Sequence, residues 1–265
     1  MKQLKILALV LVAVWMVYGV TPILAEEINI VGTGAGMATL EGLAKAFNKV
    51  NPDVTVYVPK SIGSGGGIKA VGADQAVIGR TSRGINDKEK EYQLTYLPFA
   101  KLPIVFYTHK GVKIKSLSPQ QICSLYDGKT ANWKLVGGSD STVWIVRREE
   151  GDSSLEVLVK SFPGFKDITI TSKSKMALND QEALEAVQRK EGSIGFGSFD
   201  NTKNTDVTTL TIDGKAPTDA AYPYFGTLAL IFKEKNKSGS IAKFADFVKS
   251  KAAQQVIKEV GGLPY

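Results

Sequence analysis

The residues in this chain that could do chemistry lie in short runs of glycine, serine and arginine. Residues 61–69 read SIGSGGGIK and follow the apolar stretch 54–58. Four glycines around Ser64 let the backbone turn sharply and aim several N–H groups at one point. A helix that began at about Gly65 would add the partial positive charge of its N-terminus. The run predicts a cradle for an anion, and a flexible surface turn is the alternative.

A second candidate is Arg148, which precedes another polar turn, residues 149–154 (EEGDSS). A guanidinium presents a planar pair of donors that matches a tetrahedral oxyanion, as a lysine does not. The alternative is a surface ion pair with Glu149 or Glu150. Because two other glycine-containing turns are expected at the same sheet edge, we expect Arg148 to bind a ligand.

Nucleotide-binding motifs are incomplete in both glycine runs. In residues 32–36 (GTGAG) the third glycine of the dinucleotide fingerprint would fall at Met37, and no acidic residue ends the next strand. Residues 63–69 lack the Gly-Lys-Ser/Thr ending of a P-loop. The sequence therefore disfavours dinucleotide binding and nucleotide hydrolysis.

No set of residues predicts catalysis or metal binding. His109, the single histidine, is expected at a strand end, facing solvent or a hinge. Cys123, the single cysteine, is expected on the buried face of a helix beside Ile122, as inert core. One histidine and one cysteine do not make a soft-metal cluster. We expect a protein that is not an enzyme and uses no cofactor or metal.

The N-terminus predicts export. Lys2 and Lys5 precede an unbroken apolar stretch, residues 6–20, which Pro22 follows, and Ala25 offers a cleavage point. Residues 1–25 therefore read as a signal peptide, and an uncleaved membrane anchor is the alternative. Without these two lysines the charge is 31 basic against 26 acidic residues, a net +5. This mild, dispersed charge does not indicate a nucleic-acid binder.

Strands and helices alternate through the rest of the chain. In the first part, strands at 28–31, 54–58 and 76–79 are separated by glycine turns and by helices at 40–50 and 65–71. This alternation predicts an α/β fold with a mostly parallel sheet, whose ligands bind at the carboxyl ends of the strands. A strand at 102–107 is expected to cross into a second lobe, and one at 226–232 to return. Later elements are expected at 119–126, 143–146, 155–162, 181–189, 192–197, 241–248 and 252–260.

Six short motifs occur in an order and spacing that is specific as a set. They are GSGGGI (63–68), IGRTSR (78–83), LSPQQI (117–122, with YDGKTANW at 126–133), RxxGxSS (148–154), GSIGF (192–196) and GGLP (261–264). Through them almost the whole chain after residue 25 resembles the phosphate-binding proteins of ABC importers, the PstS-like branch of the type 2 periplasmic binding proteins. The resemblance implies two α/β lobes, each a mixed sheet flanked by helices, with the ligand in the cleft between them. Lobe 1 would comprise residues 26–105 and 224–265, and lobe 2 residues 106–223.

The resemblance also implies the ligand-binding residues. Ser64 is similar to the hydroxyl donor of the family's glycine loop, Ser82 to the polar position after the third strand, and Arg148 to the cleft arginine. In the first glycine turn, backbone N–H groups and the Thr33 hydroxyl would replace the usual Thr or Ser donor. The complete expected set is Gly34, Ala35, Gly36, Ser64, Gly65, Ser82, Arg148, Asp152, Ser153 and Ser154.

Two residues depart from the family pattern: Asp152 stands in place of a serine and Leu155 in place of a frequent arginine. One hypothesis is that Asp152 accepts a proton-bearing oxygen of phosphate and so selects against sulfate. The other is that Asp152 points away and caps the following helix.

The resemblance implies a monomeric, periplasmic or otherwise extracytoplasmic protein that binds inorganic phosphate and delivers it to an ABC permease in the membrane. The alternatives are a binder of another oxyanion such as a phosphonate, a sensor or surface protein that uses the same cleft, and, as the weakest, an enzyme acting on a phosphorylated substrate.

Overall fold

The computed structural model describes residues 26–265. The predicted signal peptide, residues 1–25, lies outside the described residues. Within them, no helix is both long and apolar enough to cross a membrane.

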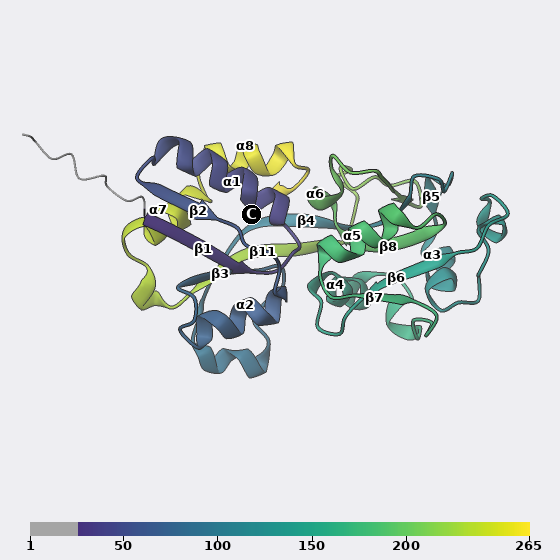
Figure 1. Ribbon diagram of the computed structural model, residues 1–265, viewed down its shortest axis with the longest axis horizontal. Coiled ribbons are helices and arrows are strands. Elements are labelled where there is room, and N and C mark those ends of the chain that lie inside the picture. The colour runs from purple at the N-terminus through teal and green to yellow at the C-terminus, as the bar shows by residue number, and fades with distance from the viewer. Residues whose placement is uncertain (1–25) are drawn as a thin grey trace, which may run out of the picture.

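A long mixed sheet runs through two lobes, with helices packed around it (Figure 1). Its main path has the strand order β2-β1-β3-β11-β4-β8-β6-β7, and β12 and β9 pair with opposite halves of β4. The outer strands of each lobe pair in parallel, whereas β11 and β4 in the middle run antiparallel to their neighbours. The strands of this sheet are β1 (Glu26–Gly32), β2 (Val54–Tyr57), β3 (Ile78–Thr81), β4 (Thr95–His109), β6 (Trp144–Arg148), β7 (Lys175–Ala177), β8 (Ser193–Ser198), β9 (Val207–Thr209), β11 (Phe225–Phe232) and β12 (Leu263–Pro264). A separate parallel pair consists of β5 (Ser116–Leu117) and β10 (Thr211–Ile212).

Strand β4 connects the two lobes. Its residues 95–103 pair with β11, and its residues 104–108 pair with β8 (Figure 1). The sequence predicted only 102–107, because Pro98 and Lys101 interrupt the apolar pattern before it. The ladder with β11 is irregular beside Pro98: Leu228 pairs with Ala100 and Ala229 with Pro98, which leaves Phe99 as an extra residue in β4. Proline has no N–H to donate, and such bulges interrupt the ladder locally.

Each lobe has its own hydrophobic core. One core draws its residues from 28–102 and 228–257, and the other from 104–224. Burying two separate apolar clusters stabilises two structural units, which supports our proposal that the lobes divide near residues 105 and 224. The helices around these cores are α1 (Met37–Val50), α2 (Gly63–Gly72), α3 (Pro119–Tyr126), α4 (Ser153–Ser161), α5 (Asp180–Arg189), α6 (Phe199–Thr202), α7 (Gly239–Phe247) and α8 (Lys251–Glu259), with 3₁₀ turns η1 (Asp87–Tyr92), η2 (Trp133–Val136), η3 (Phe165–Asp167) and η4 (Glu234–Asn236).

Some helix boundaries follow from local sequence. Ser118 caps α3 by accepting a hydrogen bond from the Gln121 N–H, and Pro119 occupies the first helical position, as predicted. Helix α2 begins at Gly63 rather than at about Gly65. Ser64 therefore lies in the first turn of a helix, where its neighbours' N–H groups have no partners within the helix.

The prediction that Cys123 lies on the buried face of its helix is wrong. It is only half-buried, and its thiol contacts the Pro163 carbonyl oxygen at 3.5 Å. Helix α3 turns Ile122 and Tyr126 into the core, and a residue directly after Ile122 is rotated by about 100° from it, toward the edge of the buried face. His109 ends β4, as predicted.

Candidate functional site

Hydroxyl groups from separate strand ends lie together between the lobes. Ser64 is in the first turn of α2, Ser82 directly follows β3, and Ser153 begins α4. Ser82 Oγ donates a hydrogen bond to Ser153 Oγ at 2.6 Å, and Ser64 Oγ accepts one from the Ser82 N–H at 3.3 Å. Thr33 Oγ1 lies 3.5 Å from Ser153 Oγ. All four side chains are buried, so both lobes contribute to one polar cluster at the carboxyl edge of the sheet.

Arg148 lies at the end of β6 and is only 2 % exposed. Its guanidinium contacts three carboxylates: Glu149 accepts hydrogen bonds from Nε and Nη2 at 3.0 Å each, Asp152 Oδ2 is 2.9 Å from Nη2, and Asp180 Oδ2 is 3.0 Å from Nη1. The ion pair with Glu149 considered from the sequence is therefore present, with two further carboxylates beside it. Burial acts to lower the pKa of Arg148, but the three carboxylates outweigh it and raise the pKa.

Asp152 combines capping with ion pairing. Its Oδ1 accepts a hydrogen bond from the Leu155 N–H at 2.8 Å, which caps α4, and its Oδ2 contacts Arg148. Burial raises the pKa of Asp152 to about 7; Arg148 opposes the rise and Asp180 adds to it. The capping role expected from the sequence is present in this geometry, and acceptance of a ligand proton stays a prediction.

The sequence reasoning missed Asp180. This residue begins α5, is 5 % exposed, and reaches from lobe 2 to the first glycine turn of lobe 1. A Cβ on Gly34 would lie 2.4 Å from Asp180 Oδ2, so a side chain at this position would displace the carboxylate. Among the described residues neither carboxylate oxygen accepts a hydrogen bond, and the contact with Arg148 is an ion pair. Its position could have indicated it, because it opens a helix shortly after a strand, as Ser153 does.

Arg80 positions the glycine turns. It is fully buried in β3, and its guanidinium donates to three backbone carbonyls: Thr33 at 2.7 Å, Pro59 at 2.8 Å, and Ile30. These bonds join the turns that follow β1 and β2. Burial lowers the pKa of Arg80 to about 10, so the side chain remains charged at neutral pH. In the sequence analysis Arg80 appears only as part of the motif at 78–83, because an arginine at a strand end is usually exposed to solvent.

Lobe 2 caps the first helix of lobe 1. Helix α1 has Gly36 at its N-cap, with no capping side chain of its own. Instead, Asp200 Oδ2 accepts hydrogen bonds from the Thr39 N–H at 3.0 Å and the Thr39 hydroxyl at 2.9 Å, and Ser198 Oγ accepts one from the Gly36 N–H at 3.2 Å. Burial raises the pKa of Asp200. These bonds between the lobes stabilise the arrangement in which the hydroxyl cluster forms.

A second link between the lobes involves Arg83. It forms a bidentate ion pair with Glu89 and also contacts Glu156 of α4, with Nε 3.3 Å from Oε1. Gly65 lies beside this group, where a Cβ would be 3.5 Å from Arg83 Nη2.

The structure therefore brings some of the predicted ligand-binding residues together and leaves others apart. Ser64, Ser82, Arg148, Asp152 and Ser153 come together. Ser154 is fully buried next to them, and its Oγ has no hydrogen-bond partner among the described residues.

The first glycine turn differs from the prediction in one respect. The Ala35 N–H donates to Thr33 Oγ1 at 3.2 Å and the Gly36 N–H to Ser198 Oγ, so both already have partners within the protein. Gly34 packs against Asp180. The ligand-binding roles of Gly34, Ala35, Gly36 and Gly65 stay predictions.

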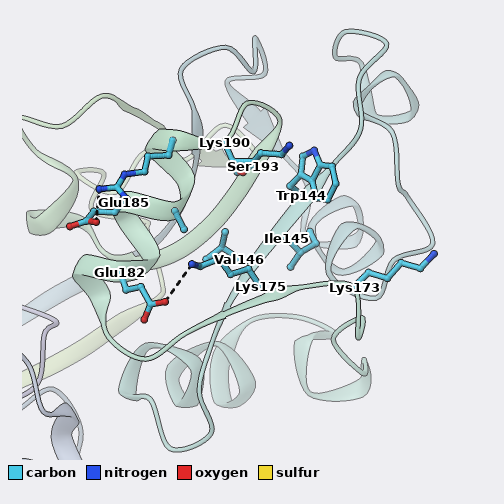
Figure 2. A pocket seen from close by; sticks show the side chains of 11 residues that line it. Trp144, Ile145, Val146, Lys173, Lys175, Glu182, Glu185, Lys190 and Ser193 are labelled. Carbon is cyan, nitrogen blue, oxygen red and sulfur yellow. Dashed lines mark ion pairs between the residues drawn. The ribbon is translucent and has the colours of Figure 1, made fainter.

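A pocket of about 430 Å³ lies elsewhere, on lobe 2 between β6, β7 and α5 (Figure 2). Trp144 forms one wall, with Lys190 Nζ 4.3 Å from the centre of its ring, and Lys175 pairs with Glu182 at 3.5 Å. Trp144 and Arg148 occupy opposite ends of β6, about 13 Å apart along an extended strand. The pocket is thus separate from the hydroxyl cluster.

The donors gathered at the candidate site suit the binding of an oxyanion. Hydroxyl groups, a charged guanidinium and the first turns of α2 and α4 are all donors to negative oxygen. Among residues 26–265 no group of three or more His, Cys, Asp or Glu side chains has the arrangement of a metal site.

Two lobes that share a mixed sheet, with polar strand ends facing one another where the lobes meet, define a binding protein of the periplasmic type. The chain belongs to the PBP superfamily: the PBP_like_2 family model, described as a PBP superfamily domain, matches residues 21–252.

Several relatives match along most of their length. A phosphate-binding protein PstS of Borreliella burgdorferi is 23 % identical over 249 residues, which covers 89 % of this chain and 89 % of that protein. The PstS of Bacillus subtilis is 24 % identical over 248 residues, covering 90 % of this chain and 80 % of that protein. A structure from Clostridium perfringens, described as a phosphate ABC transporter substrate-binding protein with bound phosphate, superimposes with a TM-score of 0.80 at 28 % identity, over 91 % of this chain and all of that one.

These comparisons confirm the two-lobe α/β fold predicted from the sequence and the distant relationship to PstS proteins. They also agree with the prediction of a binding protein rather than an enzyme, because the relatives are named as phosphate-binding proteins.

Proposed function

We propose that this chain is an exported substrate-binding protein that captures inorganic phosphate between its lobes and delivers it to an ABC permease. The observation that carries the proposal is the cluster of Ser64, Ser82 and Ser153 hydroxyls, contributed by both lobes near Arg148. The relationship to phosphate-binding proteins supports the choice of ligand, and the predicted signal peptide supports export to the periplasm or another extracytoplasmic space. The protein would act as a monomer.

The lobes must part for a ligand to enter this cluster. Ser82 and Ser153 Oγ are 2.6 Å apart, whereas two hydroxyls that donate to the same phosphate oxygen are about 4–5 Å apart. Phosphate would therefore insert between the lobes and replace this direct contact. Closure over the anion would then present one surface to a permease.

The hydrogen bonds available suffice for tight binding. Micromolar affinity corresponds to about −8 kcal/mol, and hydrogen bonds to a charged group contribute about 1.5–3 kcal/mol each. Four or five bonds from the serine hydroxyls, Arg148 and backbone N–H groups would contribute about 6–15 kcal/mol, a range that includes this figure before the ordering costs of binding.

A second candidate is another protonated oxyanion, such as a phosphonate. The observation that favours it is the set of carboxylates around Arg148, which can accept a hydrogen bond from an acidic ligand oxygen.

Isothermal titration with phosphate, methylphosphonate, sulfate and molybdate tests the proposal. We expect one phosphate per chain, bound at micromolar Kd or tighter. Ser82→Ala and Ser153→Ala should each weaken phosphate binding by about 10- to 100-fold, because each removes one hydrogen bond to a charged ligand. Ser161→Ala is a matched control, since Ser161 ends the same helix as Ser153, is exposed, and bonds only to the Val157 carbonyl oxygen. Equal affinity in all three variants would refute the site, and binding of another ligand in place of phosphate would refute the substrate.

A further inference from the structure

The pocket on lobe 2 exists because one helix covers only part of the sheet. The sheet ends in the order β8-β6-β7, and Val187 of α5 packs on β8, where a Cβ on Gly195 would lie 2.9 Å from its Cγ2. Residues two apart in a strand point to the same face, so Ser193 faces α5 as Gly195 does. Its cross-strand partner Trp144 faces the same side. Beside the helix, this face of β6 and β7 is left open and forms the pocket of about 430 Å³ (Figure 2).

The inner surface of this pocket is mainly apolar. Ile145, Val146 and Ala186 line it, and Trp144 is 45 % exposed beside them. Sites for small molecules typically have volumes of about 300–1,000 Å³ and apolar walls, with a few polar groups that fix the orientation of the ligand. The apolar walls therefore favour a ligand with an apolar body, and the exposed indole favours a flat ring.

The charged groups around the pocket leave an excess of positive charge. Four basic and two acidic residues line it. Both acidic side chains, Glu182 and Glu185, pair with a basic residue of the same lining, at 3.5 and 3.2 Å. The other two basic residues, Lys173 and Lys190, form no ion pair within residues 26–265. The charge of the lining is therefore complementary to an anionic ligand.

Three groups suited to a carboxylate gather at one end of the pocket (Figure 2). Lys190 Nζ lies 4.3 Å from the centre of the Trp144 ring, and the Ser193 N–H donates to the Lys190 carbonyl oxygen at 3.2 Å. The Ser193 hydroxyl is buried without a hydrogen-bond partner among the described residues, and such exceptions call for an explanation. The adjacent Glu191 is directed toward Gly111, where a Cβ would lie 3.1 Å from its Oε1. An ammonium group, a hydroxyl and an aromatic ring thus meet at one point.

From these observations we propose that lobe 2 carries a second binding site, in the Trp144 pocket, for a small aromatic carboxylate. The ring of the ligand packs against Trp144 and the apolar wall. Its carboxylate pairs with the Lys190 ammonium and gives the Ser193 hydroxyl an acceptor. The site does not depend on the proposed function, because Trp144 and Arg148 lie at opposite ends of β6 and none of the four clustered hydroxyl residues lines the pocket.

Titration with 2-naphthoate, followed by calorimetry and by the NMR signal of the Trp144 indole N–H, tests the proposal. The signal is assigned by its loss in Trp144→Leu. One 2-naphthoate per chain should bind with a submillimolar Kd and shift this signal. The neutral 2-naphthalenemethanol has the same ring system and should bind about fivefold more weakly, because it cannot pair with Lys190. Saturating inorganic phosphate should not displace 2-naphthoate.

Two variants of exposed side chains locate the probe. Lys190→Gln should weaken 2-naphthoate binding about fivefold, by loss of the ion pair. Trp144→Leu should weaken it about tenfold, by loss of the aromatic contact. Lys166→Gln is the matched control, because Lys166 is an exposed lysine of lobe 2, in η3, that does not line the pocket. It should bind 2-naphthoate as the wild type does.

The outcomes separate this proposal from the proposed function. An unshifted Trp144 signal, equal affinity for the alcohol, or wild-type affinity in both Lys190→Gln and Trp144→Leu would overturn the second site. Displacement of 2-naphthoate by phosphate would also overturn it, because the probe would then occupy the hydroxyl cluster. Absence of phosphate binding in a protein that still binds 2-naphthoate at Trp144 would overturn the proposed function alone.

Discussion

Replacing Arg148 with alanine should destabilise the fold strongly, and more at pH 8 than at pH 5. The variant leaves Glu149, Asp152 and Asp180 close together without their common counter-ion, and two of the three are at most 6 % exposed. Removing one partner from a buried ion-pair group costs about 3–5 kcal/mol. We therefore expect the free energy of unfolding at pH 8 to fall by about this amount.

The pH dependence follows from the carboxylates. A carboxyl group whose pKa is higher in the folded than in the unfolded state stabilises the fold at low pH, and this contribution is lost as the pH rises through the folded-state value. The pKa of Asp152 is already raised to about 7 by burial, and Arg148 acts to lower it. Without Arg148 the pKa rises further, so the deficit in the free energy of unfolding should be small at pH 5 and much larger at pH 8.

Urea unfolding followed by tryptophan fluorescence at the two pH values measures this effect. Arg147→Ala is the matched control: its neighbouring guanidinium is half-buried and donates to Ser174 Oγ at 3.1 Å, and it pairs with no carboxylate of the described chain. The control should lose about 1 kcal/mol, equally at both pH values. If Arg148→Ala cost no more than Arg147→Ala, or cost the same at pH 5 and pH 8, the electrostatic account of the site would be refuted.

Two further predictions concern buried carboxylates. The free energy of unfolding of the wild type should decline between about pH 4 and pH 7 as Asp152 ionises in the folded state. Asp152→Asn preserves the helix cap and should reduce this decline. Identical pH profiles of the two proteins in urea titrations would contradict this prediction. Asp200→Ala removes the cap that lobe 2 provides for α1 and should lower the free energy of unfolding by about 1–2 kcal/mol. The control is Asp206→Ala, at an exposed ion pair with Lys110, which should change the free energy of unfolding by less than about 1 kcal/mol. Equal losses in the Asp200 and Asp206 variants would show that the cap contributes nothing.

The sequence predicted the parts of the fold that depend on local pattern. Alternating strands and helices, the cap at Ser118 and the apolar face of α1 are all determined by residues close together in the chain. The positions of Ser64 and Arg148 followed from the rule that polar residues after parallel strands meet at one edge, whereas Ser82 was implied by the family resemblance.

What the sequence could not predict depends on contacts between distant segments. Asp180 follows a strand of three residues, β7, which has too few residues to show a periodicity. The burial of Arg80 depends on carbonyl oxygens from two other segments. The cap of α1 comes from Asp200, 161 residues away. The site lies between two lobes, so the arrangement of charges around Arg148 is evident only from the structure, in which both lobes are placed.

A crystal structure of residues 26–265 grown with saturating phosphate would test the central claim most directly. We predict phosphate between the lobes, with oxygens within hydrogen-bond distance of the Ser64, Ser82 and Ser153 hydroxyls and of Arg148, and with the Ser82–Ser153 contact broken. Phosphate bound only elsewhere, for example beside the lysines of the Trp144 pocket, with the serine contact intact, would contradict the account.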